Sequence, residues 1–452
     1  MFLHRSHQVA FANCAKVSSE SLEYAPCRSA INALMYLLPL ALLLVFYGLT
    51  VLGAEWERCS LPTDASATPA GLACAAMRET VLDEKLEQAL TAPLQDVVRL
   101  TMALMSVDTS TGKERQASFF LARFLMLEGM DVWLQCVTGA TACGQVNVYG
   151  DFFGEGPISG HSKPPKVLLC SHTDAVPPHV MPQLERDGDE NTWLTGRGSN
   201  DAKGQVAAMT LAALQAHRDL GLRVGLLFVS DEEVTHTGMK TANDKLFATN
   251  FPFMVMGEPT KRELISKQKG MLKVLLEATG RSAHSGYPEY GKCAITPLVE
   301  TLADLTRQRW PVDALGETTM NIGLIEGGTA ANIVPEYATA QVMFRLVGSP
   351  EPILERTCQI AEKHGVEVTV ISSNEPVEYF RLPQDLYEVG VVSYNTDTGY
   401  GTFFDRALLF GAGSILTAHT ANERVLVRDL EHLVKDHIKI IQMLYETLHD
   451  EL

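Results

Sequence analysis

Apolar and polar residues follow two different periods along the part of the chain beyond residue 80. Short apolar runs bounded by polar residues are typical of buried strands, and they occur at 166–171, 223–230 and 253–258. Between the first two runs, residues 205–217 (QVAAMTLAALQAH) carry the apolar spacing of a helix. Helical spacing also occurs at 96–105 and 116–128. Strand–helix–strand order predicts the α/β class, with a mostly parallel sheet covered by helices.

From about residue 269 the apolar residues alternate more strongly with polar ones. We expect four strands and two intervening helices there: strands 271–280, 319–328, 338–347 and 366–373, and helices 294–308 and 351–365. The order strand–helix–strand–strand–helix–strand is that of a ferredoxin-like α+β sandwich. The sequence therefore predicts an inserted lid at 270–378. The larger domain would comprise 81–269 and 379–452, with a late strand at 406–414 and a last helix at 428–448.

One long apolar segment precedes these domains. Residues 31–54 carry no charge, and at about 1.5 Å per residue a helix of that length crosses a bilayer. We expect an N-terminal tail at 1–30, a transmembrane signal anchor at 31–54, and a stalk at 55–80 that is rich in Ala, Pro, Ser and Thr. The flanking charges place the remainder in the lumen of the secretory pathway, in a vacuole or at the cell surface. The alternative is a signal peptide whose cleavage releases a secreted protein.

Composition, charge and cysteine usage exclude several classes of protein. Of the 452 residues 46% are hydrophobic and 20% charged, as in a folded globular protein, and the formal net charge is −17. That charge argues against a nucleic-acid partner, which requires a basic patch. Nine cysteines without a CxxC pair argue against a thiolate zinc site. An oxidising compartment would allow the disulfides Cys59–Cys74 and Cys136–Cys143, but we expect free buried thiols.

Acidic and imidazole side chains follow the predicted strands directly. In strand order they are His172 and Asp174, then Glu232 and Glu233, then Glu258. The loop GRGSNDAKG, which contains Asp201, lies between the first two strands, and His419 follows the late strand. Because the carboxyl ends of parallel strands meet at one edge of a sheet, we expect all these side chains to converge.

Two divalent metal ions would account for this collection of side chains, because crowded carboxylates without cations repel one another. The predicted metal ligands are His172, Asp201, Glu233, Glu258 and His419, with Asp201 between the two ions. Asp174 would accept the second N–H of His172. Glu232 would take a proton from the attacking water and pass it to the leaving nitrogen. Zinc suits these ligands, and cobalt or manganese would fit them too.

Each motif taken alone is weak. A lone HxD is more often a surface or core histidine, and a lone pair of glutamates usually faces solvent. GRGSNDAKG does not fit the pattern GxxxxGK[ST], which argues against a nucleotide site. The combination, in this order and at successive strand ends, is what indicates a metal centre.

The combined motifs resemble those of the M20 metallopeptidase family, a group of carboxypeptidases, aminoacylases, acetylornithine deacetylases and desuccinylases. The resemblance covers about residues 90–450, through SHTDAVP, GRGSNDAKG, SDEE, GEPT and the lid entry KGMLKVLLEATGRSAHSGYP. Fungal carboxypeptidase-like members look most similar. There are two departures: Gly-Ala-Gly stands at 411–413 where the family usually has Gly-Pro-Gly, and His419 is followed by Thr-Ala-Asn-Glu rather than by an Asp-Glu pair.

The resemblance implies roles for three lid residues and an activity. His284 would steady the oxyanion, often across a dimer interface, while Asn332 and Arg345 would hold the substrate's carboxylate. It implies a two-metal hydrolase that cleaves an amide bond next to a free carboxylate, as a carboxypeptidase on peptides or as an N-acyl amino acid deacylase. A homodimer through the lid is implied as well. The alternative outside the enzymes is an inactive ectodomain that acts as a receptor or scaffold. Loss of metal-ligand residues would identify such a protein.

Overall fold

The structure is a computed structural model that describes residues 57–59, 72–91, 94–138, 143–152, 164–188, 191–243, 249–382 and 386–451. The predicted tail at 1–30 and anchor at 31–54 lie outside these residues. Within the described ranges, every helix is too short or too polar to cross a bilayer.

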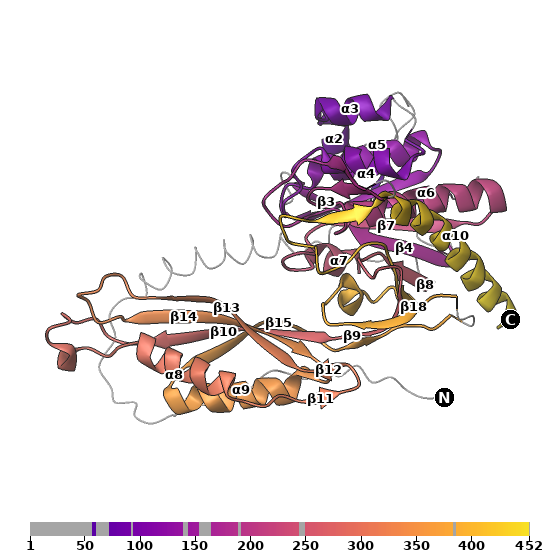
Figure 1. Ribbon diagram of the computed structural model, residues 1–452. Coiled ribbons are helices and arrows are strands. Elements are labelled where there is room, and N and C mark those ends of the chain that lie inside the picture. The colour runs from indigo at the N-terminus through magenta and orange to yellow at the C-terminus, as the bar shows by residue number, and fades with distance from the viewer. Residues whose placement is uncertain are drawn as a thin grey trace, which may run out of the picture. The chain divides into compact units, whose positions relative to one another are not determined.

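A ten-stranded sheet forms the centre of the larger domain (Figure 1). Its middle four strands pair in parallel, in the order β7 (Val224–Val229), β4 (Val167–His172), β8 (Phe251–Met256) and β18 (Phe404–Leu409). The strands toward one edge pair antiparallel: β3 (Gln145–Asp151), β2 (Asp131–Thr138) and β1 (Glu57–Cys59). Toward the other edge lie β9 (Leu264–Gln268), β16 (Val377–Glu378) and β17 (Val389–Val392). The predicted α/β fold is confirmed, with the parallel strands at its centre.

Alternate residues of the central strands pack against different layers. Val167 and Leu169 of β4 belong to a core beneath the longer helices, whereas Leu168 and Cys170 pack on the opposite face. The longer helices are α4 (Val97–Met105), α5 (Arg115–Leu127), α6 (Lys203–Leu220) and α10 (Val427–Asp450). On the opposite face the described residues include the short helix α7 (Thr237–Ala242) and side chains around residues 379, 392 and 403. Helix cover is therefore unequal on the two faces.

The N-terminal part of the larger domain corrects the predicted stalk at 55–80. β1 extends the large sheet, and α2 (Leu72–Glu79) buries Ala73 and Met77 in the core. The Ala- and Pro-rich composition did not predict this short helix, because Ala is common both in flexible linkers and in packed helices. A second short helix, α3 (Glu84–Leu90), follows.

Two disulfides correct the expectation of free thiols at four positions. Cys59, at the end of β1, is joined to Cys74 of α2, and Cys136 of β2 is joined to Cys143. The first pairing follows from the contact of α2 with β1, and the second from the antiparallel pairing of β2 with β3, which brings Cys143 close to Cys136.

The lid has the predicted ferredoxin-like order. Its sheet runs β13 (Thr319–Gly327), β14 (Tyr337–Leu346), β10 (Gly270–Thr279) and β15 (Glu367–Asn374), all antiparallel. Figure 1 shows α8 (Ile295–Thr306) and α9 (Pro350–His364) on one face of this sheet, where they cover an apolar core. Among the described residues, no helix packs on the other face. The predicted lid end at 378 falls in β16, which pairs with β9 of the large sheet.

The remaining strands are short. β5 (Gln183–Asp187), β6 (Asn191–Thr195) and β19 (Arg424–Leu426) form a three-stranded sheet, and β11 (Val312–Asp313) pairs with β12 (Gly316–Glu317). β6 and β19 matter for the site, since they flank the loops that carry Asp201 and His419.

Replacing both Cys59 and Cys74 by serine is expected to lower the free energy of unfolding by about 3 kcal/mol, because the disulfide restricts the unfolded chain. The sequence separation that it closes is 15 residues. Urea denaturation without reductant measures the change. Cys293→Ser is the control, since Cys293 is not in a disulfide. Equal stability of the double variant and the parent would contradict the expectation.

Candidate metal centre

The parallel strands bring the predicted acids and histidines to one edge of the large sheet. His172 is the last residue of β4, Glu233 lies shortly after β7, and Glu258 lies two residues after β8. The loop between β6 and α6 adds Asp201, and the loop between β18 and β19 adds His419. His172, Glu233, Glu258 and His419 thus follow the carboxyl ends of the four central strands, where open α/β sheets hold their ligands, and Asp201 reaches this edge from the loop after β6.

Asp201 lies between two histidines, with one carboxylate oxygen facing each. Its Oδ1 is 3.2 Å from His172 Nε2, and its Oδ2 is 3.2 Å from His419 Nε2. Glu258 Oε1 lies 3.8 Å from the same His172 nitrogen, and Glu233 Oε2 lies 2.9 Å from the same His419 nitrogen. The five side chains thus form two half-sites, His172 with Glu258 and His419 with Glu233, that share Asp201.

The electrostatics of this cluster fit divalent cations. Burial raises the pKa of Glu258 well above its usual value, and Glu258 Oε1 is buried without a hydrogen-bond partner among the described residues. Burial also raises the pKa of Glu233. Hydrogen bonds with Asp201 and Glu233 raise the pKa of His419 to about 10. The acids therefore draw positive charge to this point, and nitrogen and carboxylate donors in this mixture suit zinc.

Asp174 fixes the orientation of His172 and of the turn after β7. His172 Nδ1 lies 3.4 Å from Asp174 Oδ1 and 3.1 Å from the Asp174 backbone oxygen. The backbone N–H groups of Glu232 and Glu233 donate to the two Asp174 carboxylate oxygens, each at 3.1 Å. With Nδ1 engaged in this way, His172 Nε2 is left facing Asp201.

Glu423 is a supporting residue that sequence reasoning did not find. Its Oε1 accepts the backbone N–H groups of Gly198 and Asp201 at 2.8 and 3.2 Å, and its Oε2 forms a buried ion pair with Arg197. One carboxylate therefore holds the whole loop that carries Asp201. The available signal was an acid four residues after His419, in a segment that departs from the family pattern.

A second buried group surrounds Glu232, the predicted acid–base residue. His236 Nδ1 lies 2.9 Å from Asp397 Oδ1 and 3.7 Å from Glu232 Oε1, and the His236 ring stacks on Tyr400 with centroids 4.2 Å apart. Burial, reinforced by the charge of Glu258, raises the pKa of Glu232 well above its usual value. A carboxyl group with a raised pKa is suited to accepting and releasing a proton near neutral pH.

A pocket of about 210 Å³ adjoins these acids and extends to the lid. Asp201, Glu232, Glu258 and His419 line it together with Arg345 of β14. Burial lowers the pKa of the half-buried Arg345 guanidinium. The structure thus brings the predicted carboxylate-binding arginine to the metal centre.

His284 and Asn332 are not brought to this pocket. Both are exposed, and the residues that line the pocket in the described part of the chain do not include them. They lie next to each other, since the Ser285 N–H donates to the Asn332 backbone oxygen at 2.9 Å. The reason is the length of the lid strands: Arg345 is at one end of β14, and both residues lie in turns beyond the other end, about 30 Å away at roughly 3.3 Å per residue.

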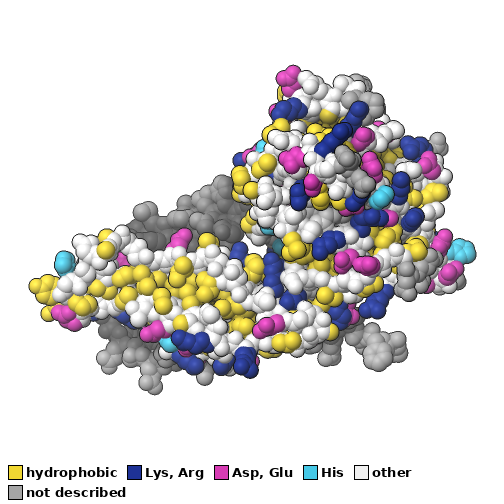
Figure 2. All heavy atoms as spheres, viewed as in Figure 1, with side chains coloured by type: hydrophobic (Ala, Val, Ile, Leu, Met, Phe, Trp, Pro, Cys, Tyr) yellow, Lys and Arg dark blue, Asp and Glu magenta, His cyan; other side chains and the backbone are white. Residues whose placement is uncertain are grey.

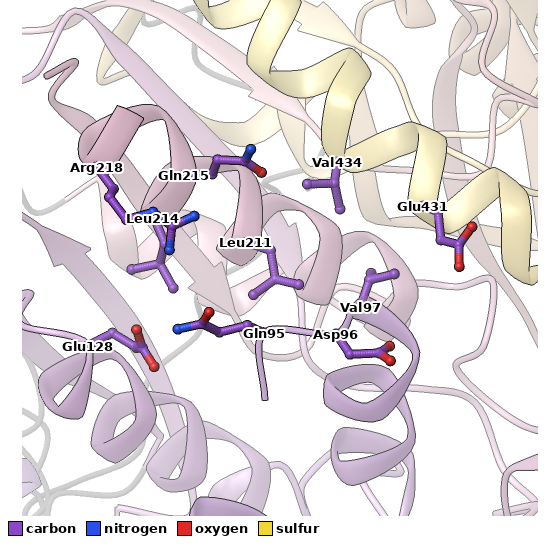
Figure 3. A pocket seen from close by; sticks show the side chains of 10 residues that line it. All are labelled: Gln95, Asp96, Val97, Glu128, Leu211, Leu214, Gln215, Arg218, Glu431 and Val434. Carbon is purple, nitrogen blue, oxygen red and sulfur yellow. The ribbon is translucent and has the colours of Figure 1, made fainter. Parts of the chain in front are cut away.

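A further pocket lies elsewhere, between α4, α6 and α10 (Figure 3). Leu211, Leu214 and Val434 form its apolar part, and its rim is polar. Because no residue of the predicted site lines it, it plays no part in the centre described above.

Comparison with known proteins shows which family the chain resembles in sequence. Residues 266–369 match a family model described as the M20 peptidase dimerisation domain. A probable carboxypeptidase of Aspergillus terreus is 38% identical over 367 residues, which is 75% of this chain and 84% of the relative. A probable carboxypeptidase of Aspergillus niger is 33% identical over 404 residues, 82% of this chain and 95% of the relative. This chain belongs to the M20 peptidase family.

Solved structures agree on the fold of this M20 chain. A tripeptidase from Staphylococcus aureus has a TM-score of 0.62 at 20% identity and covers 78% of this chain and 98% of its own. An M20 family metallo-carboxypeptidase from Sulfolobus solfataricus has a TM-score of 0.56 at 16% identity and covers 80% and 99%. The predicted family and the predicted enzyme class, a hydrolase of the metallopeptidase type, are confirmed.

Glu423→Gln is expected to weaken zinc binding about tenfold or more, because supporting residues orient the ligands of a metal. The amide cannot form the ion pair with Arg197 that holds the Asp201 loop. Titration of the metal-free protein against a zinc chelator measures the affinity. Glu446→Gln, at an exposed position of α10, is the matched control. Unchanged affinity in Glu423→Gln would show that this carboxylate does not support the centre.

Proposed function

We propose that this M20 enzyme is a two-metal carboxypeptidase that removes the C-terminal residue of a peptide. The observation that carries the proposal is the position of Arg345, which lines the same pocket as the paired half-sites. The fungal relatives named probable carboxypeptidases support it.

Two divalent ions, for which zinc is the proposed identity, would be held by His172, Asp201, Glu233, Glu258 and His419. When bound, they would supply Lewis acidity at the scissile carbonyl. The shared Asp201 suits a pair of ions, because one of its carboxylate oxygens faces each half-site. Cobalt or manganese would use the same donors.

Arg345 would hold the free carboxylate of the substrate. A guanidinium binds a carboxylate with two parallel hydrogen bonds, which fixes both the position and the direction of the substrate. Arg345 has no ion pair or hydrogen bond to another side chain in the described part of the chain, so its donors remain available. Binding there places the last amide bond of a peptide over the acids of the large sheet.

Glu232 would carry the proton during cleavage. It takes a proton from the attacking water as the C–O bond forms, and it gives that proton to the amide nitrogen as the C–N bond breaks. Glu232 is buried, lies 3.7 Å from His236 Nδ1 and lines the pocket, so it can reach the reacting groups there. Asp174, through the backbone of Glu232, fixes where the carboxyl group sits.

A homodimer through the lids is part of the proposal. β13 is an edge strand of the lid sheet, and its side chains Ile322, Leu324 and Ile325 are 37%, 55% and 55% exposed. Figure 2 shows hydrophobic side chains gathered over the region where Figure 1 places the lid strands. Such a surface on an unpaired edge favours pairing with a second copy. His284 and Asn332, which lie together beyond the far end of the lid strands, would then act at the pocket of the other subunit.

We also propose that the enzyme works in an oxidising compartment, the secretory lumen, a vacuole or the cell surface. The two disulfides support this location, since disulfides persist in such compartments and are rare in the cytosol. The membrane anchor at 31–54 remains a prediction, with secretion after cleavage as its alternative.

Glu232→Gln is expected to lower kcat by roughly 10²- to 10⁴-fold while zinc content stays unchanged, because the amide cannot accept the proton. The assay uses C-terminally free peptides and N-acetyl amino acids, each with and without a chelator. Preference for peptides supports a carboxypeptidase, and preference for N-acetyl amino acids would make the enzyme a deacylase instead. Wild-type protein that binds no metal and cleaves neither class would leave the receptor or scaffold interpretation.

Leu324→Glu together with Ile325→Glu is expected to convert a dimer into monomers, because charges replace apolar side chains at the β13 edge. Light scattering coupled to size exclusion measures the mass. Leu220→Glu, which adds the same charge at an exposed position at the end of α6, is the control. Parent and double variant of equal mass would contradict dimerisation through this edge. Loss of activity with the dimer would support a shared site.

A further inference from the structure

The open face of the lid sheet carries a second cation beside Arg345. Along β10 and β14, alternate residues face the helices and form the lid core, whereas Lys273, Met343 and Arg345 lie on the face without helices and line the pocket of the metal centre. In the strand register Met271 lies opposite Arg345 and Lys273 opposite Met343. Lys273 and Arg345 are therefore diagonal neighbours, with backbones about 7–8 Å apart.

Lys273 has no acidic cross-strand neighbour on the lid sheet, and the carboxylates that line the same pocket are Glu232 and those of the metal centre. Its cross-strand neighbours are Met343 on β14 and Ser372 on β15, both uncharged. Glu277, the next acid on the same face of β10, accepts a hydrogen bond from the Tyr337 hydroxyl at 2.5 Å. Among the described residues Lys273 has no ion-pair partner. A half-buried ammonium normally has an anion nearby, because its partial desolvation is otherwise unfavourable.

Uncharged polar side chains lie next to Lys273 and to the pocket residue Asn395. The Tyr400 hydroxyl lies 3.5 Å from the Ser372 hydroxyl and donates to Asn374 Oδ1 at 3.2 Å, and Asn395 Nδ2 donates to the Tyr400 oxygen at 3.3 Å. Asn395 itself lines the pocket. These hydroxyl and amide groups can hydrogen-bond a polar substrate group, and the carboxylates that line the pocket are Glu232 and those of the metal centre.

We propose that Lys273 determines specificity by binding a second carboxylate of the substrate, the side chain of an acidic C-terminal residue. The inference rests on the proposed carboxypeptidase function, in which Arg345 binds the α-carboxylate. A C-terminal glutamate or aspartate then presents its two carboxylates to the two cations on one face of the lid. An uncharged C-terminal residue would leave the ammonium without a partner.

The test compares peptides that differ only in the charge of the last residue. The wild-type enzyme is expected to hydrolyse acetyl-alanyl-glutamate with kcat/KM about tenfold or more above that for acetyl-alanyl-glutamine, as a charge-assisted hydrogen bond provides. Lys273→Met, which keeps the length and removes the charge, is expected to bring this ratio close to one. Lys273→Arg is expected to preserve it. Lys363→Met, on the exposed part of α9 over the other face of the lid sheet, is the matched control and should not change the ratio.

Each contrary result is distinct. A wild-type ratio near one, or a ratio that Lys273→Met leaves unchanged, would overturn the assignment while leaving the carboxypeptidase function intact. Equal loss on both peptides in Lys273→Met would mean that the lysine only balances the acids of the metal centre. Dependence on Lys273 confined to N-succinylalanine, an acyl substrate measured alongside, would place the second carboxylate on the acyl side and overturn the proposal. Failure of the wild type on every peptide would refute the carboxypeptidase function itself, and this inference with it.

Discussion

Negative charge held out of water at the carboxyl ends of parallel strands is the constraint on which the site depends. Glu232, Glu233 and Glu258 meet Asp201 there, and burial raises the pKa of the three glutamates. Such a cluster is stable only with positive charge inside it. The nitrogens of His172 and of the imidazole on the opposite side of Asp201 mark where that charge belongs. Asp174, which contacts His172, and Glu423, which accepts the Asp201 backbone N–H, hold the Asp201 carboxylate between these two imidazoles.

The lid supplies positive charge at one end and, as proposed, contacts to a partner at the other. Near the large sheet its open face presents Lys273 and Arg345, two cations that line the pocket of the acidic centre and form no direct ion pair among the described residues. About 30 Å away along the strands, the turns carry His284 and Asn332. A single antiparallel sheet thus links substrate recognition with the surface that would meet a second subunit. This separation explains why one chain alone assembles only part of the residues that the family resemblance implies.

Much of this arrangement could be predicted from the sequence, because its signals are local. An apolar run followed at once by a histidine or acids, as at 166–174, encodes both the buried strand and the group at its end. The lid order followed from alternation in the same way. The short antiparallel strands such as β5, β6 and β9 were missed, since they are too brief and too polar to show a period. Glu423, His236 and Lys273 were missed because each acts through neighbours that are distant in sequence.

Anomalous scattering at the zinc absorption edge, from crystals of the zinc-loaded protein, would locate the metal ions directly. We expect two peaks on either side of the Asp201 carboxylate, one within reach of His172 and Glu258 and the other within reach of His419 and Glu233. Zinc found elsewhere, or no zinc at Asp201 in crystals grown with the metal in excess, would contradict the central claim that these buried acids form one paired metal centre.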